Sequence, residues 1–299
     1  MDNRPDYEKG TVSGWMHRFM EEHAKWFWVL YSVLIVLVIY KAFSLTFLEK
    51  TPYSWDYAFH HITLALLSIL MMREAYRGEF HMGFRGKGFW KGLVMCWPAL
   101  VFLAVNLAGS LCIGRVYPES LIQELVKNFS IGLFEEVVVR AVLVGHMMHY
   151  WRNSPRRVFN AVLWSSVLFG VLHIGNALAA PLNTAFQIFY ATGFGIIFAA
   201  VYIRTRNLWS CILVHALVDF TGSLTLIYLP LQPDYEAYGA AAADLTYLVP
   251  SVAPDWLISG WGLIAILGLL LGTALSVAVG IYELRKAKAE ETALLWEKM

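Results

Sequence analysis

Eight apolar segments dominate this 299-residue sequence, and each is expected to be long enough to cross a lipid bilayer. Their approximate limits are 26–47, 56–72, 89–112, 121–149, 157–175, 182–203, 207–228 and 256–282. A segment inside lipid must satisfy its backbone hydrogen bonds internally, so it forms a helix or part of a closed barrel. The sequence lacks the alternation of barrel strands. It therefore predicts an all-α fold, a polytopic membrane helix bundle with about eight transmembrane helices.

The composition excludes several other classes of protein. Hydrophobic residues make up 58% of the chain, charged residues make up 15%, and the mean hydropathy is +0.54. Soluble domains are nearer one quarter charged, so lipid must cover most of this surface. The net charge of +1 argues against nucleic-acid binding, which needs a basic face. The cysteines Cys96, Cys112 and Cys211 lie in or beside apolar segments and match no metal or disulfide pattern.

Lysine and arginine are distributed unevenly between the two sides of the predicted bundle. Of the 23 such residues, 18 lie in the two tails and in the loops that share their side. This bias predicts an integral, multi-pass protein with both termini in the cytoplasm. The expected divisions are a cytoplasmic segment 1–25, a membrane domain 26–283 and a cytoplasmic tail 284–299. Short loops and the lack of a targeting sequence favour a prokaryotic cytoplasmic membrane.

Two features interrupt this regular pattern. Pro98 falls within the third apolar segment, where it predicts a kink. The segment 229–255 is the longest external connection, with four prolines and no lysine or arginine. We expect it to be a solvated connection, with a lid over a site as the alternative.

Adjacent carboxylates, Glu135 and Glu136, lie inside the fourth apolar segment, and Arg140 follows. A charge at bilayer depth costs about 2.5–3.5 kcal/mol on insertion scales, so such residues usually face a polar interior and have a function. Glu136 and Arg140 share a helical face at a spacing of four, which predicts an ion pair. Glu135 is rotated away from Glu136, so it is free to meet another partner and to act as a base for water. The alternative is a purely structural ion-pair cluster.

Two further apolar segments carry polar residues of the same kind. His173 ends the fifth segment, and His215 and Asp219 share a helical face in the seventh. Asp219 is expected to accept a proton from one nitrogen of His215, which leaves the other nitrogen for substrate or water. Taken singly, His173 fits a hydrogen bond between helices, and His215 with Asp219 fits a satisfied buried pair. Taken together, the three segments predict one shared polar pocket.

The motifs Glu135-Glu136-x-x-x-Arg140, Phe169-x-x-x-His173 and His215-x-x-x-Asp219 resemble those of the CAAX protease and bacteriocin-processing (CPBP, or Abi) family. The resemblance covers about residues 120–225 and implies an intramembrane protease that acts on a membrane-associated peptide or protein. It implies that Glu135 activates water, that His173 helps to place this water, and that His215 and residue 219 stabilise the oxyanion. Glu136 and Arg140 would support the geometry.

Asp219, the last residue of the third motif, differs from the residue that is frequent at this position in the family. An asparagine there donates a hydrogen bond, whereas an ionised Asp219 cannot. Either Asp219 is protonated, or it only orients His215, and we favour the second.

Two histidines and a glutamate also suit zinc by ligand type. The chain has no His-Glu-x-x-His pair, and the resemblance is to glutamate-dependent enzymes, so we expect no metal cofactor, with zinc as the alternative.

Other functions remain open alternatives for a chain of this kind. A non-catalytic membrane scaffold or sensor would keep the fold, but it would have little reason to retain all the intramembrane polar residues. A proton-coupled transporter would use glutamate and histidine as a relay, yet the sequence shows no inverted repeat. For a protease, the resemblance implies prenylated carboxyl-terminal motifs in eukaryotes, and bacteriocin maturation or self-immunity in prokaryotes.

Overall fold

The computed structural model describes residues 14–15, 18–19, 22–23, 53–75, 82–85, 87–113, 118–178, 181–227, 255–287 and 289–292. All regular elements in these ranges are helical, which confirms the all-α prediction. The first predicted span (26–47), most of 1–25 and nearly all of the connection 229–255 lie outside the described residues. The expectations for them stay predictions.

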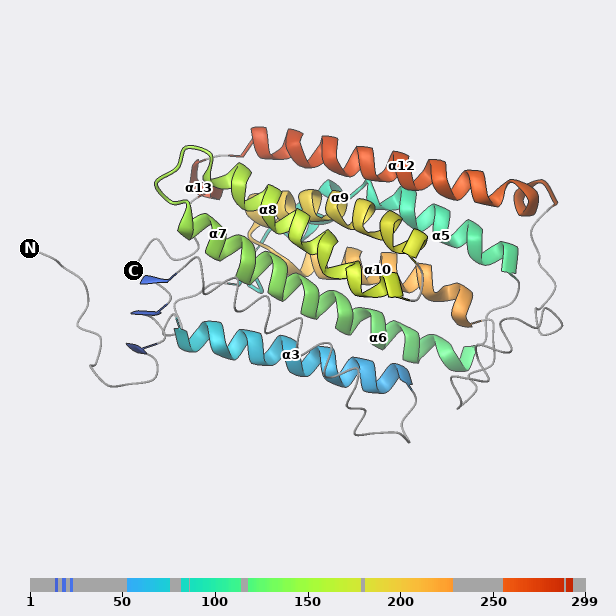
Figure 1. The fold of residues 1–299 in the computed structure, drawn as a ribbon, viewed down its shortest axis with the longest axis horizontal. Coiled ribbons are helices and arrows are strands. Elements are labelled where there is room, and N and C mark those ends of the chain that lie inside the picture. The colour runs from blue at the N-terminus through green and yellow to red at the C-terminus, as the bar shows by residue number, and fades with distance from the viewer. Residues whose placement is uncertain are drawn as a thin grey trace, which may run out of the picture.

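The helices form an elongated bundle in which most axes run along the long direction of the molecule (Figure 1). Their bounds are α3 (Tyr53–Ala75), α4 (Phe89–Met95), α5 (Ala99–Ile113), α6 (Pro118–Glu136), the π-helix η1 (Val137–Val144), α7 (Gly145–Tyr150), α8 (Arg157–Val171), the 3-10 helix η2 (Leu172–Leu178), α9 (Pro181–Thr205), α10 (Leu208–Ile227), α12 (Asp255–Arg285) and α13 (Ala289–Thr292). Helix α6 packs against α3 and α10, and α12 packs against α5 and α9. Helices α3 and α12 thus lie on opposite sides of the bundle (Figure 1).

Fewer helices qualify as membrane spans than the eight expected. Within the described ranges, three helices are long and apolar enough: Arg157–Ala177, Pro181–Thr205 and Asp255–Arg285. The pair Phe89–Met95 and Ala99–Ser110 makes a fourth if it is one broken span. The pair is bent by 67° where Pro98 lies, which confirms the predicted kink. The segment 121–149 is helical but is not among them, because Glu135, Glu136 and Arg140 make its most apolar part too charged.

The surface of α12 supports a lipid environment for the bundle. Only 22% of the most apolar 18-residue stretch of this helix is buried within the protein. Its exposed side chains include Leu263, Ile266, Leu267, Leu270 and Leu271. A contiguous apolar face of this kind is rare on soluble monomers and is normal where lipid replaces water. The protein is therefore an integral membrane protein.

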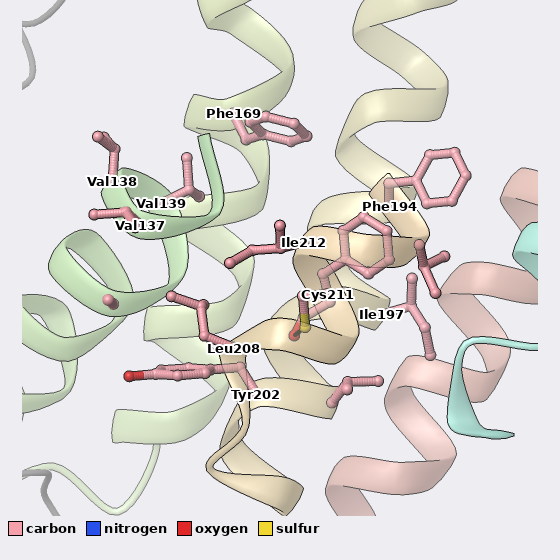
Figure 2. Close-up of a cluster of buried hydrophobic side chains, with 14 of the residues drawn as sticks. Val137, Val138, Val139, Phe169, Phe194, Ile197, Tyr202, Leu208, Cys211 and Ile212 are labelled. Carbon is pink, nitrogen blue, oxygen red and sulfur yellow. Dashed lines mark hydrogen bonds between the residues drawn. The ribbon is translucent and has the colours of Figure 1, made fainter. Parts of the chain in front are cut away.

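The core lies where η1, α8, α9 and α10 meet. Figure 2 shows Val137, Val138 and Val139 of η1 near Phe169 of α8, with Cys211 and Ile212 of α10 beside them. All eight residues of η1 are buried. The ionisable residues of the fourth segment are thus enclosed by apolar side chains from several helices.

Candidate active site

A buried ion pair joins the end of α6 to η1. Arg140 Nη1 lies 3.0 Å from Glu136 Oε1, and both side chains are fully buried, as the spacing predicted. The guanidinium also lies over the rings of Phe169 and Phe198, at 4.5 and 5.2 Å from their centroids. A desolvated cation on an aromatic face gains about 2 kcal/mol, which helps to offset the cost of burying Arg140.

The π-helix itself was not predicted from the sequence. Its hydrogen bonds run from residue i to i+5, so its turn is wider than that of an α-helix. It begins at Val137, directly after the two glutamates, and contains Arg140. Segments of this kind are rare and occur frequently at functional sites. Five valines in eight residues are no specific signal, because the same run suits an ordinary buried helix.

His215 connects the ion pair to the other acidic groups. Its Nδ1 lies 2.7 Å from Glu136 Oε1, and because an ionised carboxylate only accepts, Nδ1–H is the donor. Its Nε2 lies 3.3 Å from Asp219 Oδ2 and 3.6 Å from Glu135 Oε2. The imidazole thus spans from a buried, charge-paired glutamate to two further carboxyl groups.

This arrangement corrects the expected role of Asp219. We expected Asp219 to fix the orientation of His215 from one nitrogen and to leave the other for substrate. In the structure Glu136 holds Nδ1 and Asp219 lies at Nε2, so neither nitrogen is left without a neighbouring carboxyl group. The spacing of four between His215 and Asp219 correctly predicted contact, but it carried no information about the long-range contact with Glu136.

Protonation decides how the groups around His215 Nε2 interact. A neutral imidazole with Nδ1–H has only a lone pair at Nε2, and ionised Asp219 and Glu135 offer only acceptors. The contact of 3.3 Å between Nε2 and Asp219 is therefore a hydrogen bond only if a proton lies between them, either on the imidazole or on the carboxyl group.

Glu135 has a free acceptor at the centre of this group. Its Oε2 atom is buried and has no hydrogen-bond partner among the described residues. At 3.6 Å, His215 Nε2 is slightly too far to satisfy it. Buried polar atoms are almost always paired with protein or water. A water that donates to Glu135 Oε2 would satisfy this acceptor.

His173 lies at the edge of the same group, at the start of η2. Its Nδ1 donates to the Phe169 carbonyl at 2.9 Å, so Nε2 is the nitrogen left for another partner. The Phe169 ring makes edge contacts with both His173 and His215, at centroid distances of 5.2 and 5.9 Å. His173 also interacts electrostatically with Glu135. Phe169 therefore separates the two imidazoles and fixes their spacing.

Exposure varies across the site. The side chains of Glu136 and Arg140 are fully buried, and His215 is 9% exposed. Glu135 and Asp219 are 24% and 34% exposed, so the outer edge of the site is accessible. The inner pair is thus enclosed by protein, whereas the outer carboxyl groups lie at the accessible edge of the site.

Close packing of α6 on α10 brings these groups together. A Cβ atom at Gly132 would lie 3.1 Å from the carbonyl oxygen of Ile212, so glycine allows the two backbones to approach. The N-terminus of α10 is capped by Asn207, whose Oδ1 accepts a hydrogen bond from Ser210 N at 3.0 Å. These two contacts help to fix the position of His215 along α10 relative to Glu136.

All six residues singled out from the sequence thus fall in one region. Glu135, Glu136, Arg140, His215 and Asp219 are linked by direct contacts, and His173 is linked through Phe169. Their catalytic and supporting roles stay predictions.

The sequence analysis missed other residues of this region. Phe198 covers Arg140 from α9, at 5.2 Å from the ring centroid to the guanidinium carbon. It carried no signal, because the chain has 18 phenylalanines.

The donor set bears on the zinc alternative. Within the described ranges, no three His, Cys, Asp or Glu side chains are placed to hold one ion. The Nδ1 atoms of His215 and His173 are engaged by Glu136 and by the Phe169 carbonyl, contacts that zinc-bound imidazoles also make, so they do not exclude a metal at Nε2. The metal-free site and its zinc alternative both stay predictions.

Comparison with known proteins supports the family resemblance. Residues 117–221 match the model described as type II CAAX prenyl endopeptidase Rce1-like. The core of the chain is therefore similar to this family. The match contains all six residues of the candidate site, and the predicted resemblance to CAAX proteases is confirmed over this core.

The similarity extends to a characterised protein. CAAX prenyl protease 2 of Saccharomyces cerevisiae is 29% identical over 143 residues, which is 42% of this chain and 45% of the yeast protein. The aligned part thus spans less than half of that relative. No solved structure matches the chain significantly.

Proposed function

We propose that this Rce1-like protein is an intramembrane endopeptidase in which Glu135 activates a water molecule. The observation that carries the proposal is the buried, unpaired Glu135 Oε2 beside His215 Nε2. A carboxylate with a free acceptor in an apolar enclosure is suited to accept a proton from water. The Rce1-like match of the same residues supports peptide hydrolysis over other water-dependent reactions.

The proposed reaction begins with a water held by Glu135 Oε2 and His173 Nε2. The water oxygen forms a bond to the carbonyl carbon of the peptide, and one water proton passes to Glu135. The carbonyl oxygen becomes an oxyanion, for which donors near His215 supply stabilisation. The carbon–nitrogen bond then breaks, and the leaving amine receives the proton from Glu135. The products are a new carboxyl group and a new amine.

Glu136 and Arg140 act on this reaction through His215. The hydrogen bond from Nδ1–H to Glu136 stabilises positive charge on the ring. It also keeps Nε2 directed toward Glu135 and Asp219. A fixed imidazole needs no reorganisation when charge develops, which is how preorganised sites lower a barrier.

A prenylated carboxyl-terminal peptide is the proposed substrate. The family description names CAAX prenyl endopeptidases, and a CAAX motif carries its lipid on the cysteine. A lipidated peptide would partition into the bilayer that surrounds this bundle. Bacteriocin maturation and self-immunity, together with a prokaryotic membrane, stay predictions that the yeast relative does not favour.

We also propose the membrane topology predicted from the charge distribution. Both termini would lie in the cytoplasm, with eight crossings and the divisions at residues 25 and 283. The support is the lysine and arginine bias in the sequence. Under this topology α6 crosses despite its charged residues, because α3 and α10 pack on it.

The test is cleavage of a farnesylated peptide ending in a CAAX motif by the protein reconstituted in liposomes. Mass spectrometry would measure release of the carboxyl-terminal tripeptide. We expect release by the wild type and a loss of at least about 100-fold for Glu135→Gln, because general bases contribute 10²–10⁴-fold. Unchanged thermal unfolding of the variant would exclude misfolding.

A matched control is available on the same helix. Glu124 is buried, pairs with Lys127 at 2.5 Å, and lies 11 residues before Glu135, or about 16 Å along the axis. Glu124→Gln should keep turnover within a few-fold of the wild type. Equal turnover of Glu135→Gln and wild type would refute Glu135 as the base. A wild type that cuts no prenylated peptide would refute the proposed substrate.

A further inference from the structure

Helices α6 and α10 lie side by side and are hydrogen-bonded at a second place, away from the site (Figure 1). Asn128 Nδ2 of α6 donates to Ser223 Oγ of α10 at 2.9 Å, and both residues are buried. Inside a membrane, asparagine and serine side chains that bond across helices hold the helices together, because the alternative is an unsatisfied polar group. The pair therefore fixes one point of α10 to one point of α6.

This second contact is in register with the contact at the site. Asn128 precedes Glu136 by eight residues on α6, and Ser223 follows His215 by eight residues on α10. The two helices thus run antiparallel, and the two contacts lie about 12 Å apart along each of them. A slip of α10 by one turn, about 5.4 Å, would break both contacts at once.

Asp219 lies midway between the two contacts on α10. It follows His215 by four residues and precedes Ser223 by four, so the three side chains share one face of the helix. Gly132 is at the matching midpoint of α6, where a Cβ atom would lie 3.1 Å from the Ile212 carbonyl oxygen. A glycine has no side chain to interlock with the facing helix, so this close contact does not itself set a register. The polar pairs on either side of it are suited to do so.

Other buried hydroxyl groups of the bundle are used differently. Ser166, Thr192 and Ser276 each donate to a carbonyl four residues earlier in their own helix. Such bonds do not connect one helix to another. The contact between Asn128 and Ser223 does, and it connects the two helices that carry Glu135 and Asp219.

The bond can be removed without leaving the serine hydroxyl unpaired. Ser223 Oγ also donates to the Phe220 carbonyl of its own helix at 3.0 Å. Asn106 of α5 holds the same part of α10 by donating to the Val218 carbonyl at 3.0 Å. An apolar residue in place of Asn128 should therefore cost no more than one ordinary hydrogen bond and leave the fold intact.

We propose that Asn128 and Ser223 are positioning residues of the peptidase site. Their hydrogen bond sets the register of α10 on α6, and this register places His215 and Asp219 beside Glu135. The inference rests on the proposed peptidase function and adds two residues to it. Neither residue touches the reacting atoms or exchanges a proton, so the steps proposed for water, Glu135 and the leaving amine are unchanged.

The test compares Ser223→Val with Ser223→Thr in the liposome assay. Both new side chains are β-branched, so the two variants differ mainly in the hydroxyl that accepts from Asn128. We expect Ser223→Val to lower kcat about tenfold with KM within about twofold, because a misplacement of 1 Å caused far from the chemistry can cost about 10²-fold. Ser223→Thr should keep kcat within about twofold of the wild type. Equal kcat in the two variants would overturn the positioning role of the hydroxyl.

The partner residue gives a second variant. Asn128→Leu replaces the amide by an apolar side chain of similar size and should lower kcat as much as Ser223→Val. The double variant should be no worse than either single variant, because both changes remove one hydrogen bond. Losses that multiply in the double variant would contradict a shared role.

A matched control lies on α12. Ser276 is a buried serine whose hydroxyl donates within its own helix, to the Gly272 carbonyl at 2.8 Å. Ser276→Ala should keep the wild-type kcat. Thermal unfolding of every variant would give the folded fraction to which kcat is normalised.

The outcomes separate this inference from the function on which it depends. Wild-type kcat in Asn128→Leu, a loss confined to KM, or a loss explained by the folded fraction would overturn the positioning role while Glu135→Gln still supports the peptidase. A wild type no more active than Glu135→Gln would overturn both. A fall in kcat in Asn128→Leu and Ser223→Val, absent from Ser223→Thr and Ser276→Ala, is the supporting result.

Discussion

Glu136 Oε1 accepts a hydrogen bond from His215 Nδ1 at 2.7 Å while it pairs with Arg140 Nη1 at 3.0 Å. One oxygen thus joins a cation to an imidazole in an enclosure closed to solvent. The pair Glu136–Arg140 costs desolvation energy, so its presence is explained better by orientation of His215 than by stability.

Glu136→Gln is expected to destabilise the protein by about 3–5 kcal/mol, because it leaves the buried Arg140 without an anion. Adding Arg140→Met should recover much of that loss, since an apolar pair of similar volume is often as stable as a buried ion pair. Activity should stay low in both variants, because His215 has lost its charged partner. Thermal unfolding together with tripeptide release would measure the two effects. Recovery of activity along with stability would show that the ion pair serves folding alone.

His173 allows the two ring nitrogens to be tested separately. The side-chain amide of Asn reaches about as far as Nδ1 and that of Gln about as far as Nε2, and Nδ1 here is bound to the Phe169 carbonyl. His173→Gln should therefore retain more activity than His173→Asn, with the Asn variant lower by about 100-fold or more if the water contact is lost. The measurement is kcat for both variants at equal folded fraction. The reverse order would indicate that the contact with Phe169, and with it the shape of η2, is what matters.

Much of the site followed from the sequence because its signals are local. Glu136 and Arg140, and His215 and Asp219, are pairs four residues apart within one helix, where spacing fixes contact. The cost of ionisable groups in lipid also indicated that these segments face each other. The kink at Pro98 is likewise a property of one residue.

The rest depended on contacts between distant segments. Nothing in the sequence specified that Glu136, and not Asp219, would hold His215 Nδ1, since 79 residues separate the two partners. The π-helix after Glu136 has the composition of an ordinary buried helix. Phe198 lies on α9, a helix that carries none of the three motifs, and only its contact with Arg140 in the folded protein reveals it.

Turnover is expected to withstand strong chelators. The proposed water is activated by Glu135, and within the described ranges no three His, Cys, Asp or Glu side chains are placed to hold one ion. Dialysis against 1,10-phenanthroline, followed by tripeptide release and metal analysis of the protein, would check this. A loss of activity that added zinc restores would reinstate the metal alternative, because a catalytic zinc itself lowers the barrier to water attack.

Asp219→Asn tests what the carboxyl group at this position contributes. An amide here donates where the ionised carboxylate cannot, and Asp219 is 34% exposed, so the change should leave the fold intact. We expect Asp219→Asn to raise kcat by up to about tenfold, part of the value of one oxyanion donor, as measured by tripeptide release. A tenfold fall in kcat at an unchanged unfolding temperature would show instead that the reaction needs the charge of Asp219, which lies 3.3 Å from His215 Nε2.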